Sequence, residues 1–485
     1  MSLPESVPTV PSANNRGTFL TLFPIWIGLV LVGIFSVSGL AMFQLVAEKR
    51  AAVFDVGILK GEPIVFHHDQ HAYLNAARHL ATEPDYAMPR YRSPGLPWLL
   101  SFLYAPEDDY TPSDPKKDHR RVSEAFFTKA KHFAVILAMI SLVSLFFFAR
   151  LCLPLAESFL FAWACGWLLY VFKAPYVRPE LAFYTLFFMT VILCLRLLRR
   201  PSWILSLITG ALLAAAYLLK SVVLPLVALF LGCLLIKAVH DWLVRRRGYR
   251  ETAFRHAGKD LAKGLLVPLS FFLLLSPYFA TTARLNNGNP FYSIHSSVFM
   301  WMDSRKEKLQ WNEDGEVDEG PESPSLKRYL KTHNFVQIVD RPWVGARNTL
   351  RRIRQDYYQL HVFTTYGLGM VVALVTTLNI GRVLAALRAR WIAVLFLAGC
   401  FLGFGAIYGW YEKLNMGPRG LLSLYPFLPF FGLWLLARFA PDGGFRFRSW
   451  SLGLRVLCLS YLFLHLAVAT GFVIASSAWT LDGAG

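Results

Sequence analysis

Long runs of apolar residues recur along almost the whole chain and are separated by short polar connections. Each run is close to the roughly 20 residues that an α-helix needs to cross a bilayer, and by this rule we predict about eleven spanning helices. The first run lacks a small-residue cleavage pattern at its end, which indicates a retained span rather than a signal peptide. The predicted spans are residues 19–46, 127–150, 154–172, 180–198, 203–219, 221–243, 264–283, 362–384, 391–411, 419–438 and 452–476.

This pattern predicts an all-α polytopic membrane protein with one membrane domain, residues 19–476. Residues 1–18 are expected to form a disordered tail, because the segment is rich in Pro and Ser. Two polar stretches are long enough to form structure outside the lipid, 47–126 and 285–361. Residues 477–485 are expected to form a short C-terminal tail.

The basic residues of the short connections predict the orientation, because cytoplasmic loops carry an excess of Lys and Arg. If the N-terminus is cytoplasmic, every basic short connection falls on the cytoplasmic side, and the C-terminal tail and both long stretches face outward. The cytoplasmic residues are then Arg16, Arg150, Arg196, Arg199, Arg200, Arg245, Arg246, Arg247, Lys263, Arg382, Arg388, Arg390, Arg438, Arg446, Arg448 and Arg455.

The composition excludes an ordinary soluble globule. Only 16% of the 485 residues are charged, whereas soluble domains average about 25%. The formal net charge of +18 is spread over many connections, which favours topology and lipid phosphates over nucleic acid as its explanation. All six cysteines fall inside apolar runs, so the polar loops hold neither a disulfide framework nor a thiolate metal cluster.

The outward stretches are themselves basic. Long loops cross the membrane regardless of charge, which is one explanation; the other is that the outer face handles an anionic, lipid-borne substrate. The residues concerned are Arg78, Arg90, Arg92, Lys116, Lys117, Arg120, Arg121, Arg305, Lys306, Lys308, Arg341, Arg347, Arg351, Arg352 and Arg354.

A short helical pattern begins near Asp69 in the first outer stretch. Apolar or small residues recur at helical spacing at Tyr73, Ala77 and Leu80. Asp69 is therefore either a helix N-cap or a carboxylate with a chemical role. Arg92 then precedes a Pro-Gly turn and an apolar segment that is too short to span, which we expect to lie in the membrane interface.

Four charged residues stand at the outer ends of predicted spans. Arg178 and Glu180 open one span, either as an interfacial ion pair or as charge that lines a cavity. Lys220 lies in a nearly continuous apolar run, where a lysine is costly and usually has an anionic partner; snorkelling at a tight turn is the alternative. Arg419 opens a late span, and a guanidinium there can form two hydrogen bonds with a phosphate.

Together these motifs resemble those of the GT-C glycosyltransferases, in particular the bacterial protein mannosyltransferase and lipid A aminoarabinose transferase group. The chain departs from the family pattern at Gln70, where a second acidic residue is common, and in the insertion 106–131. The matching residues follow the family order and are Asp69, Tyr73, Ala77 and Leu80; Arg92, Pro94, Gly95 and Pro97; Arg178 and Glu180; Ala214 to Lys220; Asn287 to Tyr292; and Arg419 to Pro426.

The resemblance implies a GT-C fold in a bacterial cytoplasmic membrane, and transfer of a sugar from a polyprenyl phosphate carrier to an acceptor hydroxyl on the outer side. Asp69 is the expected general base for that hydroxyl. Lys220, Arg178, Arg419 and Arg92 are expected to bind the donor phosphate, whose developing charge needs cations in a water-poor site. A single base without a nucleophilic carboxylate implies inversion at the anomeric carbon.

Several residues have supporting or alternative roles under this hypothesis. Glu180 and Asp55 are alternative bases, and Tyr73 supports the site. The histidines beside Asp69 either hold a divalent metal or donate hydrogen bonds to phosphate; we favour the second and expect no cofactor. These histidines are His67, His68 and His71. The expected partners are the lipid-linked sugar, an acceptor lipid, glycan or protein, and the bilayer, without nucleic acid.

Two other functions remain open. A transporter or flippase of lipid-linked sugars needs ionisable groups deep in its helices and often has paired repeats, whereas the charges here concentrate at outer helix ends and the sequence shows no paired repeat. A ligase or polymerase of lipid-linked glycans would use related chemistry with a diphosphate carrier.

Overall fold

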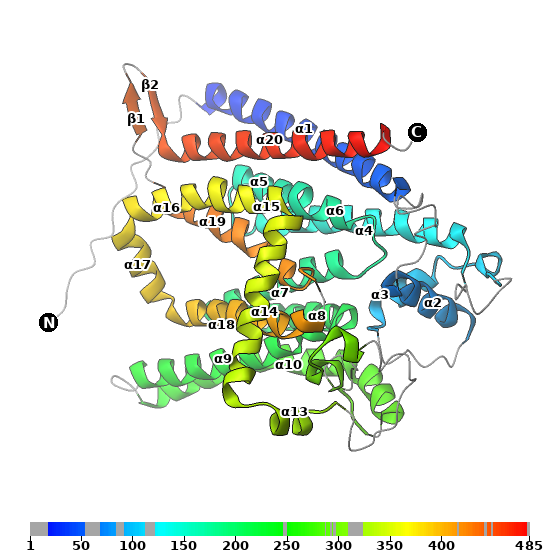
Figure 1. Cartoon of the computed structure of the whole chain (residues 1–485). Coiled ribbons are helices and arrows are strands. Elements are labelled where there is room, and N and C mark those ends of the chain that lie inside the picture. The colour runs from blue at the N-terminus through cyan, green and yellow to red at the C-terminus, as the bar shows by residue number, and fades with distance from the viewer. Residues whose placement is uncertain are drawn as a thin grey trace.

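The computed structural model describes residues 18–53, 68–83, 92–111, 122–245, 250–286, 288–291, 293, 297–308, 324–414, 417–440, 444–447 and 450–482. Nine helices within this part of the chain are long and apolar enough to cross a bilayer, and one further apolar helix is shorter. The prediction of an all-α polytopic membrane protein is therefore confirmed. Most of these helices run side by side along one direction (Figure 1).

The helices follow the predicted apolar runs closely, because the bilayer thickness sets both the length and the composition of a span. The first run lies within α1 (Thr18–Val53). The others correspond to α4 (Glu124–Ala149), the continuous helix Leu155–Lys173, α7 (Glu180–Arg199), α8 (Trp203–Leu219), α9 (Leu224–Arg245), α10 (Arg250–Leu285), the continuous helix Tyr358–Leu378, α18 (Trp391–Trp410), α19 (Phe427–Phe439) and α20 (Leu454–Asp482).

The span predicted over residues 362–384 is present, but its bounds are Tyr358–Leu378. The helix ends at Leu378, and Asn379 leaves the helical conformation with φ −131° and ψ 27°. Its side-chain amide donates a hydrogen bond to the carbonyl oxygen of Val375 at 3.2 Å, which satisfies a group at the helix end. The amphipathic helix α17 (Ile380–Ala389) then carries the basic residues away from the span. A strand pair, β1 (Gly444–Phe447) and β2 (Trp450–Gly453), was also not predicted.

The basic connections gather at one end of the bundle. Arg390, at the start of α18, lies close enough to Arg199 and Arg438 for their charges to interact, and its burial is the main reason that its pKa is lowered. At the same end Arg455 forms an ion pair of 2.5 Å with the buried Glu157. The predicted clustering is therefore present for these four arginines, while the cytoplasmic location of this end stays a prediction.

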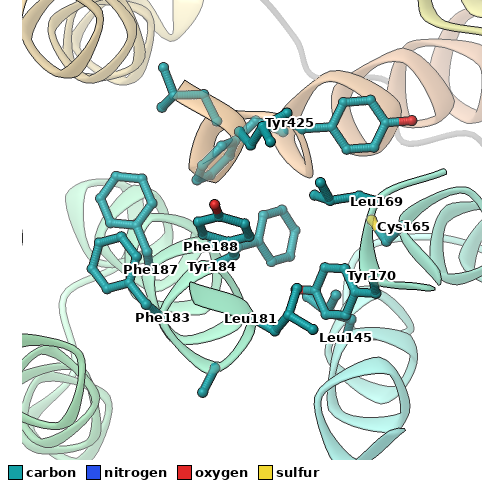
Figure 2. Close-up of a cluster of buried hydrophobic side chains, with 14 of the residues drawn as sticks. Leu145, Cys165, Leu169, Tyr170, Leu181, Phe183, Tyr184, Phe187, Phe188 and Tyr425 are labelled. Atoms are coloured by element: carbon teal, nitrogen blue, oxygen red, sulfur yellow. The ribbon is translucent and has the colours of Figure 1, made fainter. Parts of the chain in front are cut away.

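Aromatic side chains of α7 fill the centre of the bundle (Figure 2). Phe188 packs against Phe427 and Phe430, with ring centroids 5.1 and 5.2 Å apart. Four residues before Phe188, the hydroxyl of Tyr184 donates a hydrogen bond to the backbone carbonyl of Arg419. This packing fixes the start of α7 relative to the turn that precedes α19.

The first outer stretch forms α2 (His68–Thr82), α3 (Gly95–Ser101) and a short turn, Pro106–Asp108. Arg78 of α2 forms an ion pair with Asp109, and Tyr104 donates a hydrogen bond of 2.5 Å to the same carboxylate. Burial and the bond to Asp109 raise the pKa of Tyr104 to about 12. The neighbouring Asp108 is buried and accepts a hydrogen bond of 2.9 Å from Lys129. The ends of the predicted insertion are thus tied to α2 and α4.

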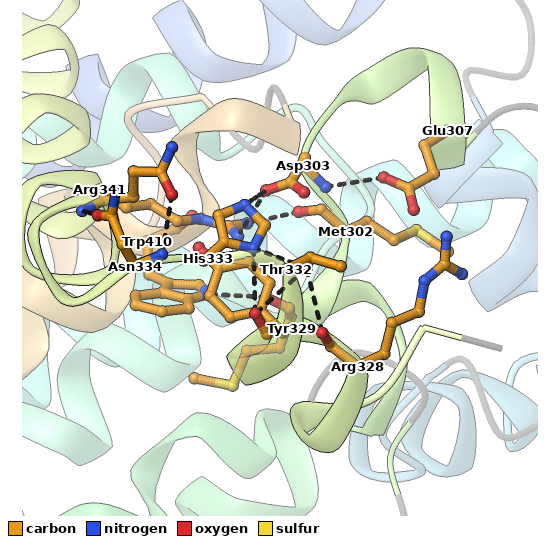
Figure 3. Close-up of polar contacts among 12 residues, drawn as sticks. Met302, Asp303, Glu307, Arg328, Tyr329, Thr332, His333, Asn334, Arg341 and Trp410 are labelled. Carbon is orange, nitrogen blue, oxygen red and sulfur yellow. Dashed lines mark hydrogen bonds and ion pairs between the residues drawn. The ribbon is translucent and has the colours of Figure 1, made fainter. Parts of the chain in front are cut away.

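The second outer stretch contains α13 (Leu326–Thr332) and α14 (Phe335–Asp356), where the sequence indicated only a long loop. The buried Arg341 donates hydrogen bonds to the carbonyl oxygens of Met302 at 2.6 Å and Trp410 at 3.1 Å (Figure 3). His333 lies 3.2 Å from Asp303 in the same cluster. These contacts hold both helices against the end of α18.

Candidate functional site

A buried carboxylate with cationic neighbours lies at the end of the bundle opposite the arginine connections. Glu180 is the first residue of α7, and its side chain is 6% exposed. The ammonium of Lys220 is 3.1 Å from one Glu180 oxygen, and a guanidinium nitrogen of Arg419 is 3.9 Å from the same oxygen. Glu180, which lies 40 residues before Lys220 in the sequence, is thus the anionic partner predicted for this lysine.

Local backbone geometry presents these side chains at one place. Lys220 ends α8 in an extended conformation, φ −154° and ψ 119°, so the chain turns there before the next helix. α7 contains 20 residues, which corresponds to about 30 Å of helix. That length equals the hydrocarbon thickness of a typical bilayer. Glu180 and Lys220 therefore lie at the membrane interface opposite to Arg199.

The carboxylate lines a small cleft. The cleft has space of about 10 Å³, which is enough for roughly one water molecule. Its walls are formed by Lys173, Tyr176, Arg178, Glu180, Leu181 and Arg419. With the adjacent Lys220, the described residues at the cleft thus comprise four cations and one carboxylate. This excess of positive charge suits the site to an anion.

Lys173 is a cleft residue that the sequence analysis did not select as a site residue. Its ammonium lies 5.8 Å from the ring centroid of Tyr176 and 5.2 Å from that of Tyr357. Burial raises the pKa of both phenols, so they stay neutral donors at pH 7. The available signal was the position of Lys173 in the short link between two predicted spans, beside Arg178.

Arg178 lies in this link, and its guanidinium is 5.1 Å from the ring centroid of Tyr176. Helix α2 docks on the same link, because Gln70 accepts a hydrogen bond of 2.8 Å from the backbone N–H of Val177. Asp69 precedes Gln70 within α2, so its backbone is brought to the edge of the cleft region. Asp69 lies in the first turn of α2 and its side chain lies outside the described residues, so both interpretations of this carboxylate stay predictions.

Several predicted site residues lie partly or wholly outside the described residues. The side chains of His68 and Asp69, and all of His67 and Asp55, lie outside the described residues. Among the described residues no group of three His, Cys, Asp or Glu side chains could hold a metal ion. His71 is half-buried on α2. The question of a metal at the histidines beside Asp69 therefore stays untested.

The Arg-x-Pro-Gly segment reaches the same region from another side. The guanidinium of Arg92 lies 5.6 Å from the ring centroid of Tyr73, a buried residue of α2. A Cβ atom on Gly95 would lie 2.8 Å from the carbonyl oxygen of Leu218, so only glycine allows this close approach to the end of α8. Leu218 is two residues before Lys220. The motifs that are scattered along the sequence thus converge at one end of the bundle.

Comparisons with known proteins show no family for this chain. No protein-family model and no curated protein matches the sequence. A solved structure of the archaeal oligosaccharyltransferase AglB from Archaeoglobus fulgidus, in complex with an inhibitory peptide and a dolichol-phosphate, is similar to 92% of this chain at 11% identity and a TM-score of 0.44. The chain corresponds to 56% of that protein's length. The described residues thus define a helical, multi-pass membrane protein with a cationic cleft at one end.

Proposed function

We propose that this protein is a GT-C glycosyltransferase of a bacterial cytoplasmic membrane. It moves a sugar from a polyprenyl-phosphate carrier to an acceptor hydroxyl on the extracytoplasmic side, within a single membrane domain of residues 19–476. The observation that carries the proposal is the cleft at the ends of α7 and α8, where four cations surround Glu180. The order of the sequence motifs supports the same reaction.

The reaction proceeds by direct displacement. The acceptor oxygen forms a bond to the anomeric carbon while its proton passes to the Asp69 carboxylate. The bond between that carbon and the phosphate oxygen breaks, and its electron pair leaves with the lipid phosphate. The anomeric configuration is inverted, because only one displacement occurs. No metal is needed in this scheme, since the protein's cations balance the charge of the leaving phosphate.

Lys220, Arg178 and Arg419 bind the donor phosphate in this proposal, and Arg92 approaches it from the Arg-x-Pro-Gly segment. Glu180 positions the cations rather than acting as the base, because a carboxylate bonded to an ammonium is a weak proton acceptor. Since the cleft holds about one water molecule, its walls must move apart when the donor enters. Phosphate oxygens then replace the Glu180 carboxylate in some of its contacts with the cations. The imidazoles beside Asp69 donate further hydrogen bonds.

The decisive test is sugar transfer by the Asp69→Asn variant in vesicles that contain polyprenyl-phosphate sugars. Loss of a general base lowers the rate by about 10²–10⁴-fold. The matched control is Glu83→Gln, which changes an exposed carboxylate just after the same helix. Full activity of Asp69→Asn would exclude it as the base. Asp55→Asn and Glu180→Gln then identify the alternative.

The same vesicles separate the other functions. Mass spectrometry of lipid that co-purifies with the protein distinguishes the carriers, and a diphosphate lipid would favour a glycan ligase or polymerase. Movement of a labelled sugar lipid between leaflets without transfer would favour a flippase. Under our proposal a monophosphate lipid co-purifies, and the triple change Arg178→Gln, Lys220→Gln and Arg419→Gln abolishes that association.

A further inference from the structure

Helix α14 is held against the bundle by one face. Its buried residues Arg341, Gly345 and Thr349 recur every four positions, and the first two contact α18. A Cβ atom on Gly345 would lie 1.9 Å from the carbonyl oxygen of Gly409. The two helix backbones therefore touch at this point, and α14 runs across the direction of the spanning helices (Figure 1).

A second face of α14 is apolar and exposed. Phe335 is 78% exposed and Trp343 is 74% exposed. At 100° per residue, these side chains lie on one side of the helix, next to the face that contacts α18. The exposed apolar residues on this face are Phe335, Val336, Val339, Trp343 and Leu350. The other described residues leave these five side chains largely exposed.

A third, cationic edge borders the apolar face. It contains the exposed residues Arg347, Arg351 and Arg354, with one carboxylate, Asp340, on the same edge. Arg352 points elsewhere, because it forms an ion pair of 3.0 Å with Glu412. The sequence of faces around α14 is thus protein contact, exposed apolar surface and net positive charge.

Two observations locate α14 at the membrane interface. Gly409 lies 18 residues after Trp391, the first residue of α18; at 1.5 Å per residue this is about 27 Å, close to the hydrocarbon thickness. In addition, α14 leads through Tyr357 directly into the candidate span Tyr358–Leu378. The helix therefore crosses α18 at the interface on the cleft side.

We propose that α14 is an interfacial helix that binds anionic phospholipids of the leaflet on the cleft side. Its apolar face inserts between lipid chains, and Arg347, Arg351 and Arg354 contact the headgroup phosphates. Net positive charge beside an exposed apolar face complements such a surface better than it complements a second cationic copy of the chain. The proposal holds whether or not the protein transfers sugars.

Spin labels test the location of the helix. In a Cys152→Ser background, which removes the cysteine that is exposed among the described residues, labels are attached to Trp343→Cys, Arg347→Cys and the control Lys331→Cys on α13. In vesicles of phosphatidylcholine and phosphatidylglycerol, we expect the label at 343 to collide more with oxygen than with a water-soluble nickel chelate. The label at 331 should show the reverse, and the label at 347 an intermediate ratio.

Two results would overturn the proposal. Equal access of the nickel chelate to labels 343 and 331 would show that the helix lies in water. Spin–spin broadening at 343 that disappears on dilution with unlabelled protein would show that a second copy covers the face.

The lipid charge is tested by replacing the cationic edge. With the wild-type edge, the label at 343 should move deeper as the fraction of phosphatidylglycerol rises, and salt should reduce this shift. The triple variant Arg347→Gln, Arg351→Gln and Arg354→Gln should lose the shift, whereas the ion-paired control Arg352→Gln should keep it. An unchanged shift in a triple variant with wild-type helicity would refute the role of these arginines.

Discussion

Removing the charge of Glu180 should destabilise the protein more than removing that of Lys220. At an effective dielectric constant of about 20, unit charges 3.1 Å apart, as in Lys220 and Glu180, attract by about 5 kcal/mol. The 3.9 Å contact of Arg419 with the same oxygen adds about 4 kcal/mol. Desolvation offsets much of this attraction, and breaking a buried pair costs a net of about 3–5 kcal/mol.

Glu180→Gln leaves the cations of the cleft without their carboxylate, so we expect a loss near the middle of this range, about 4 kcal/mol. Lys220→Met removes one cation and keeps Arg419 beside the carboxylate, so we expect about 2 kcal/mol. Both free energies of unfolding can be measured by reversible denaturation in mixed micelles. Glu83→Gln, whose carboxylate is 51% exposed, is the control and should change the stability by less than about 0.5 kcal/mol.

The double variant completes a cycle that isolates the pairwise energy. We expect the two changes together to cost less than the sum of the single changes, because neither charge is left without the other. If Lys220→Met lowers the free energy of unfolding as much as Glu180→Gln does, the contact of Arg419 with Glu180 does not contribute to stability. If the coupling energy is near zero, the ion pair does not organise the cleft.

Gly95→Ala should lower the free energy of unfolding by about 1–3 kcal/mol, because the new methyl group would lie 2.8 Å from the Leu218 carbonyl oxygen; an unchanged denaturation midpoint would contradict this contact. Gly409→Ala should lower the thermal unfolding temperature more than Gly405→Ala in the same helix, because only the first methyl group would meet the α14 backbone, at 2.1 Å; equal temperatures would argue against the crossing. The Arg78 guanidinium and the Tyr104 phenol lower the pKa of Asp109 in the folded protein. The contribution of this carboxylate to the free energy of unfolding is therefore present above its unfolded pKa of about 4, and it is lost as the pH falls through the folded pKa. Asp109→Asn should therefore flatten the acid limb of a stability profile, and an unchanged limb would show that the ion pair contributes nothing.

The sequence was sufficient for the features that each helix determines alone. A bilayer requires about 20 apolar residues in every span, so hydropathy located the spans of α4, α7 and α18 to within a few residues. A lysine in an apolar run usually has an anionic partner, and Lys220 has one. Hydropathy placed the end of one span at residue 384, whereas the helix ends at Leu378, just before the polar Asn379.

Tertiary structure decided which of these helices meet. Lys220 and Glu180 are 40 residues apart, and Gln70 and Val177 are 107 residues apart, so no local pattern pairs them. The same holds for α14, whose crossing of α18 depends on two glycines in distant segments. The bilayer constrains each span separately, whereas contacts between spans depend on how their side chains pack. The cleft and the interfacial helix therefore emerged only from the packed bundle.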